Sequence, residues 1–141
     1  MQESSTAVHE HRMSQYTSEN EIEAVVDGFE DCTTAKEAFT HREHLTVAIW
    51  YLYQFNQQEA LEKMRAGLLR FLGYHQVSAG KYKEDLTVSW IRLIDNTMKE
   101  FDSHVGLIEM TNAVIEKLSD SKLIGDGSKQ SEREARRADS E

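Results

Sequence analysis

Proline is absent from the chain, and cysteine occurs only once, at Cys32. Because no pyrrolidine ring interrupts the backbone, long helices are permitted throughout the sequence. A single cysteine excludes a disulfide within the chain, which is typical of proteins from a reducing compartment. We therefore expect a cytoplasmic protein.

Long apolar runs and clusters of basic residues are also lacking. The longest apolar run, residues 47–53, is far shorter than the roughly 18 residues that a membrane-spanning helix needs. The N-terminus shows neither the basic nor the apolar region of a secretory signal. With 16 basic and 25 acidic residues the net charge is −9, which disfavours phosphate backbones and anionic membrane surfaces. We expect neither nucleic acid nor a membrane as a partner.

Between the two ends of the chain, apolar residues recur at the three- and four-residue spacing of helices. No stretch shows the strict alternation and turn pairs of β-hairpins. The ends are polar, and the C-terminal end carries a run of charges at residues 132–137. The sequence predicts an all-α fold, a compact bundle of five or six helices, with residues 1–18 as a disordered leader, 19–119 as the helical domain and 120–141 as a disordered charged tail.

Residues that commonly begin or end helices set the predicted boundaries. Ser18 can cap the first helix, and Thr34 with Glu37 has the spacing of a capping box before a short helical turn. Asn56 can cap a later helix, and Gly73 is a typical residue for its end.

Two helices, at residues 41–55 and 84–101, are expected to pack at the centre of the bundle. Their apolar faces and that of the helix between them predict the core. The residues expected to be buried are Leu45, Ala48, Leu52, Leu68, Trp90, Ile94 and Phe101.

Two histidines stand three residues apart at the start of the predicted helix 41–55. Thr40 and Glu43 have the spacing of a capping box, which sets the beginning of this helix. His41 and His44 then share one face of its first turn. The same face continues through apolar residues, so both imidazoles are expected to point inward.

Three interpretations of this pair remain open. The histidines can bind a metal, with a third ligand from His75, Glu84 or Asp85. They can take part in proton transfer or bind an anion at the helix start. They can also be structural and hydrogen-bond to backbone or carboxylate groups. The pattern differs from the His-Glu-x-x-His motif of zinc enzymes, and no second Glu-x-x-His motif for a di-iron site is evident.

Residues 39–52, together with residues 80–85 and Trp90, resemble a family of small uncharacterised bacterial helical proteins. That family has an aromatic-Thr-His-x-x-His-Leu-x-x-Ala block and a later Gly-Tyr-His-Glu-Thr-like block before a Trp-containing helix. The resemblance covers about residues 20–115 and implies no particular activity. Lys83 stands where the family pattern has a histidine. A three-histidine metal centre would therefore lack one ligand here.

The sequence predicts a small-molecule or metal site at the His-x-x-His helix start. His41, His44 and Glu84 are the candidate ligands of a divalent transition metal. Tyr82 and Trp90 join them as candidate ligand-binding residues, because aromatic side chains often line small-molecule pockets. Whether the protein is an enzyme stays open. The alternative function is a non-catalytic helical module that forms a homo-oligomer or binds another protein through an apolar helix face.

Overall fold

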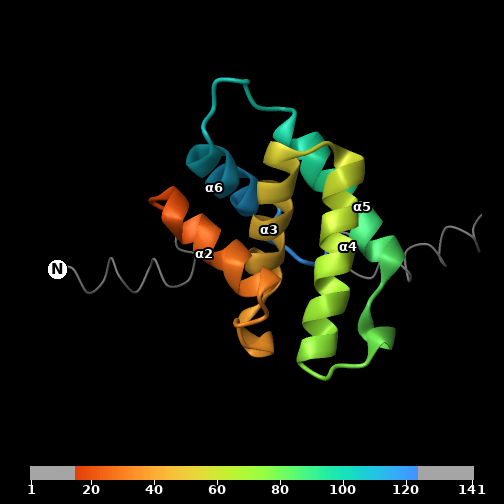
Figure 1. The fold of residues 1–141 in the computed structure, drawn as a ribbon. Coiled ribbons are helices and arrows are strands. Elements are labelled where there is room, and N and C mark those ends of the chain that lie inside the picture. Colours follow the sequence, from red (N-terminus) through yellow and green to blue (C-terminus); the bar gives the residue numbers. More distant parts are fainter. Residues whose placement is uncertain (1–14, 124–141) are drawn as a thin grey trace, which may run out of the picture.

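The computed structural model describes residues 15–123, and within this range the chain is all-α without a strand (Figure 1). This confirms the predicted fold class. The predicted leader and tail lie mostly outside the described residues, at 1–14 and 124–141. No helix in the described range has the length and apolarity to cross a membrane. The helices are α2 (Glu19–Glu30), α3 (His41–Gln54), α4 (Gln57–Tyr74), α5 (Glu84–Met98) and α6 (Leu107–Lys117), with short 3₁₀ helices η1 (Lys36–Ala38) and η2 (Ala79–Lys81).

Helix α3 is the central element of the bundle and contacts each of the other four α-helices. Figure 1 shows α2 and α6 on one side of α3, with α4 and α5 on the other. The middle of α3 is buried on every face, as Leu45, Val47 and Ile49 show. The expected central position of this helix is confirmed. Helix α5 packs against α3, α4 and α6.

Four of the seven residues expected in the core are buried. They are Leu45, Ala48, Leu52 and Ile94. The other three, Leu68, Trp90 and Phe101, are only partly buried. Leu68 and Trp90 are partly exposed because both line a pocket.

The predicted caps differ in accuracy. Ser18 forms a capping box with Glu21, and the Asn56 side chain accepts a hydrogen bond from the Glu59 backbone N–H at 2.8 Å. The turn expected after Thr34 is present as η1, but no side-chain hydrogen bond caps it and Ala35 is its N-cap residue. The capping-box spacing therefore did not identify the cap of this short turn.

Helix α4 continues one residue beyond Gly73, to Tyr74. The chain leaves the helix through Gln76, which has a φ of 60°. The Val77 backbone N–H then bonds to the Leu72 carbonyl at 2.8 Å, the six-to-one bond of a Schellman motif. The left-handed residue that ends this helix is therefore a glutamine rather than the predicted glycine.

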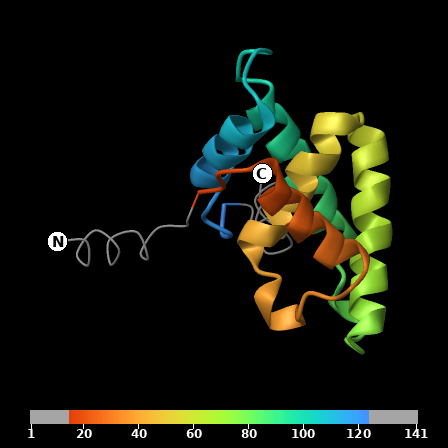
Figure 2. The same ribbon diagram turned by 60° about the vertical axis from the view of Figure 1, so that its left-hand side comes forward.

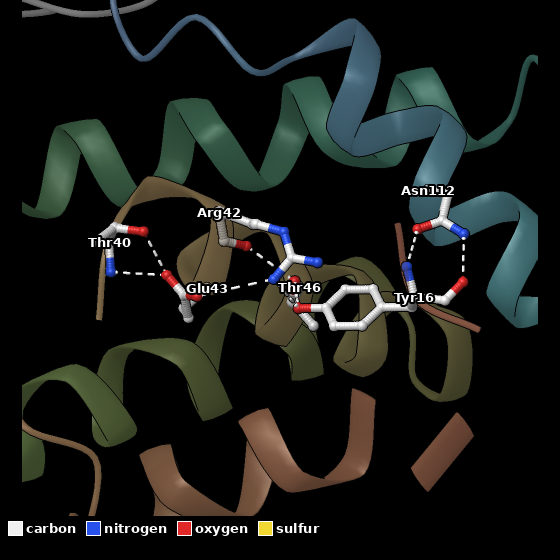
Figure 3. A network of polar contacts seen from close by, with 6 residues as sticks. All are labelled: Tyr16, Thr40, Arg42, Glu43, Thr46 and Asn112. Carbon is white, nitrogen blue, oxygen red and sulfur yellow. Dashed lines mark hydrogen bonds and ion pairs between the residues drawn. The ribbon is translucent and has the colours of Figure 1, made fainter. Parts of the chain in front are cut away.

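Tyr16 is buried, although it lies in the stretch predicted to be a disordered leader. Its phenol oxygen lies 2.9 Å from Thr46 Oγ1 and accepts a hydrogen bond from Arg42 Nη1 at 3.0 Å (Figure 3). The Asn112 side chain binds the Tyr16 backbone on both sides, accepting from its N–H at 2.8 Å and donating to its carbonyl at 2.9 Å. Figure 2 shows the start of the described chain beside α6. A single aromatic residue in a polar stretch has no periodicity that would reveal this docking.

Candidate functional site

A pocket of about 460 Å³ lies between α3, α4 and α5, near the end of the bundle where α3 and α5 begin. The starts of α3 and α5 lie at the lower end of the molecule in Figure 1. Apolar side chains from three helices form most of its lining, among them Leu45, Ala48, Met64, Leu68, Phe71 and Ile94. Most of its polar side chains come from the segments before α3 and α5 and from the first turns of these two helices. The pocket therefore joins residues that are far apart in the sequence.

The sequence-predicted residues His41, His44, Tyr82 and Trp90 all lie on the lining of this pocket. The predicted helix start accounts for the positions of His41 and His44. The Glu43 carboxylate accepts hydrogen bonds from the Thr40 backbone N–H, at 2.9 Å, and from the Thr40 hydroxyl. This fixes the first turn of α3 against the pocket. The aromatic pair comes from the α5 side of the pocket.

His44 packs into an aromatic cluster. Its ring meets Phe39 edge-on at 4.5 Å between centroids, and Phe39 lies 5.0 Å from Phe71. Burial in this apolar setting, together with the nearby His41, lowers the pKa of His44 to about 4. Glu43 acts in the opposite direction. The imidazole is therefore neutral at physiological pH, and no protein group within residues 15–123 hydrogen-bonds to it.

His41 is held by the protein itself. Its Nε2 lies 2.9 Å from the carbonyl oxygen of Leu118, at the end of α6. Its ring also packs edge-on against Trp90, with centroids 4.9 Å apart. When Nε2 carries the proton it donates to Leu118, so His41 joins the start of α3 to the end of α6. This is the structural role left open by the sequence.

Glu84 is directed toward Arg65 rather than the histidines. Arg65 Nε donates to Glu84 Oε1 at 2.9 Å, and Nη2 pairs with Oε2 at 2.5 Å. The Tyr82 hydroxyl donates to the same Oε1 at 2.6 Å. Hydrogen bonds from Arg65 and then Tyr82 hold the pKa of Glu84 at about 2. Glu84 does not line the pocket, but it holds Tyr82, which does line it.

The structure does not bring His41, His44 and Glu84 together as a metal-binding set. Among residues 15–123, no group of three or more His, Cys, Asp or Glu side chains is placed to hold a metal ion. His75, another candidate third ligand, packs against Phe71 and Tyr74 instead, with centroids 4.4 and 5.1 Å away. Metal binding thus stays a prediction from the sequence without a matching donor geometry in the described chain.

Sequence reasoning missed three lysines on the pocket lining: Lys36, Lys81 and Lys83. Lys36 belongs to η1, Lys81 ends η2, and Lys83 precedes α5. The first two lie in short segments whose approach to the pocket depends on tertiary packing, so no local pattern reveals them. Lys83 was visible as a departure from a histidine pattern, but it was interpreted as a lost ligand rather than a cation in a pocket.

Comparisons of the chain with models of known protein families, with curated proteins and with solved structures gave no match.

Proposed function

We propose that the protein binds a small organic molecule in the pocket at the His41–His44 turn. The pocket has the size of small-molecule sites, which are typically about 300–1,000 Å³. It also has their composition, a mostly apolar lining with a few polar groups that fix orientation.

One observation carries this proposal: His44 lines the pocket without a protein hydrogen-bond partner among the described residues. A neutral imidazole offers one N–H donor and one acceptor nitrogen. Neither ring nitrogen of His44 is among the fully buried polar atoms that lack a partner, so each remains accessible to a hydrogen-bonding group in the pocket. A bound molecule can supply that partner while its apolar part covers Leu68 and Trp90.

The proposal is for binding and leaves catalysis open. His44 is a weak base at neutral pH, since its pKa is about 4. His41 is occupied by the Leu118 carbonyl. Neither histidine lies in an arrangement that identifies a reaction.

A pair of leucine variants on α4 tests the proposal. Leu68 lines the pocket, while its neighbour Leu69 is 40 % exposed and does not. The probe is octan-1-ol, a neutral molecule with an apolar chain, measured by chemical-shift changes of the Trp90 indole N–H. We expect the wild type and Leu69→Trp to bind octan-1-ol and Leu68→Trp, which fills the pocket, not to bind it. Equal binding by both variants would place the probe elsewhere and contradict the proposal.

The location and partners remain proposals from the sequence. A single cysteine supports a cytoplasmic protein, and the family resemblance supports a bacterial origin. The rival function is self-association or binding of another protein. Its support is a few exposed apolar side chains on α3 and α4, such as Tyr53 and Tyr74. Scattered exposed residues are common on monomers. Native mass spectrometry of the purified protein reports oligomeric state and any co-purified molecule together.

A further inference from the structure

The charges on the pocket lining are all of one sign. Lys36, Lys81 and Lys83 line the pocket, and no aspartate or glutamate side chain of residues 15–123 does. This is unusual for a chain with 25 acidic and 16 basic residues. A random sample of this surface would bring more carboxylates than ammonium groups to a pocket. The local charge is therefore opposite to that of the whole protein.

None of the three ammonium groups is in an ion pair with any residue between 15 and 123. Several other basic side chains are paired, including Arg65 with Glu84, Lys99 with Asp95 and Lys117 with Glu100. Glu37, Glu84 and Asp85 are their nearest acidic neighbours in the sequence. Among the described residues none of these carboxylates forms an ion pair with the three lysines, and Glu84 is bound by Arg65. The positive charge at the pocket is consequently left for a ligand or for solvent ions.

The apolar part of the pocket lies between these cations and the core. Phe39, Leu68 and Trp90 belong to it, and Phe39 stacks on the fully buried Phe29 at 4.8 Å. An inorganic ion would leave this apolar surface wet. A neutral apolar molecule would leave the three cations without a partner. Only a molecule with both an anionic end and an apolar body complements the whole lining.

Resting on the small-molecule function proposed above, we propose that the ligand is an amphipathic anion, an apolar molecule with a carboxylate or phosphate head. The head lies toward Lys36, Lys81 and Lys83, and the apolar body covers Leu68 and Trp90. The neutral His44 can donate its N–H to a polar atom of the ligand. Repulsion by the net charge of −9 is limited, because the Debye length is only about 8 Å at physiological ionic strength.

Glu84 is a positioning residue in this arrangement. It binds the Tyr82 hydroxyl and Arg65, and so ties the segment that carries Lys81 and Lys83 to α4. It reaches the ligand only through that segment. Tyr82→Phe, which removes the bond to Glu84 without changing the charge, is expected to reduce the affinity for octanoate more than for octan-1-ol.

A set of octyl compounds separates the contribution of the ligand's charged head group from that of its apolar chain. The probes are octanoate, octyl phosphate, octan-1-ol and octylamine, titrated into the full chain by calorimetry in low salt. Attraction by three exposed cations predicts about tenfold tighter binding of octanoate or octyl phosphate than of octan-1-ol, with octylamine weakest. The stronger of the two anions identifies the head as carboxylate or phosphate.

The lysines are tested as a group with a charge-matched control. Changing Lys36, Lys81 and Lys83 to Gln should remove the roughly tenfold preference for octanoate over octan-1-ol. Changing Lys63, Lys117 and Lys122 to Gln alters the net charge equally but leaves the pocket intact, since none of them lines it. This control should keep the preference.

If the triple variant does not fold, the salt dependence of probe binding to the wild type still tests the proposal. Octanoate affinity should fall between about 50 mM and about 500 mM NaCl, while octan-1-ol affinity should not, because screening acts only on the charged head. Equal or tighter binding of octan-1-ol or octylamine would overturn the anion inference and leave the small-molecule function standing. Failure of all four probes to bind would count against both.

Discussion

The imidazole of His44 meets the ring of Phe39 edge-on, with an interplanar angle of 81°. Phe39 packs in turn on Phe29 and Phe71. A histidine near a helix start would ordinarily be hydrated, but this contact removes part of its ring from water. The charged form of His44 is therefore disfavoured in the folded protein, and the consequence can be measured as a pH dependence of stability.

Stability is expected to fall as the pH is lowered from about 6.5, the pKa of an unfolded histidine, toward about 4. Within this window the unfolded chain binds a proton that the folded chain does not, so lowering the pH favours unfolding. The stability lost should reach about 2–3 kcal/mol near pH 4.5. Urea denaturation at several pH values measures it.

His44→Gln is the control for this pH dependence, because it removes the titrating group and should flatten the curve over the same window. The groups that face His44 are His41, which disfavours its protonation, and Glu43, which favours it. An NMR titration that gives His44 an ordinary pKa would contradict the prediction.

Two glycines of α4 should respond oppositely to alanine. A Cβ at Gly67 would lie 2.4 Å from Cε2 of the fully buried Phe29, whereas a Cβ at Gly73 would meet nothing within 4 Å. Gly67→Ala should therefore lower the free energy of unfolding by about 1–3 kcal/mol through overpacking. Gly73→Ala should raise it by up to about 1 kcal/mol through helix propensity. Thermal melts of both variants compare them, and a Gly67→Ala protein as stable as the wild type would mean that α2 and α4 can move apart.

The sequence predicted what depends on short-range rules. The helical class, the caps at Ser18 and Asn56 and the start of α3 follow from periodicity and capping, which involve residues within a few positions of each other. The burial of Leu68 and Trp90 was overestimated, because an apolar face looks the same whether it meets a neighbouring helix or a pocket.

Long-range contacts were not predictable in the same way. Tyr16 docks on Asn112, which is 96 residues away, and the partner of His41 is a backbone carbonyl 77 residues away. Because every residue has a backbone carbonyl, the sequence cannot indicate which one His41 binds. Glu84 was matched to the histidines by residue type, but Arg65, nineteen residues away and outside the motif, is its partner.

Asn112→Ala should release the N-terminal segment from α6. The substitution removes two hydrogen bonds to the Tyr16 backbone and should cost about 1–2 kcal/mol. Hydrogen exchange of the Tyr16 amide should accelerate. Asn96→Ala on the exposed face of α5 is the matched control, since it makes the same change in helix propensity without touching Tyr16. Equal effects of the two variants would show that the Asn112 contacts contribute nothing to stability.

His41→Ala should destabilise the protein by about 1–3 kcal/mol, because the Leu118 carbonyl loses its partner and Trp90 loses a packing contact. His104→Ala serves as control: its side chain is 92 % exposed, and its loss should change the free energy of unfolding by less than about 0.5 kcal/mol. Guanidinium denaturation measures both. A His41→Ala protein with wild-type stability would remove the structural role assigned to this residue.

The last prediction concerns the metal hypothesis. In the described chain His41 Nε2 already contacts Leu118, and the Glu84 carboxylate is bound by Arg65 and Tyr82. Forming a site from His41, His44 and Glu84 would require breaking these contacts. We therefore expect calorimetric titration with Zn²⁺ to give the same weak binding for the wild type, His44→Ala and Glu84→Gln. Because neutral imidazole and carboxylate are the binding forms, the titration is run at about pH 7. Binding of one equivalent by the wild type that is lost in both variants would show that these contacts do rearrange, and would restore the metal site in place of the organic ligand.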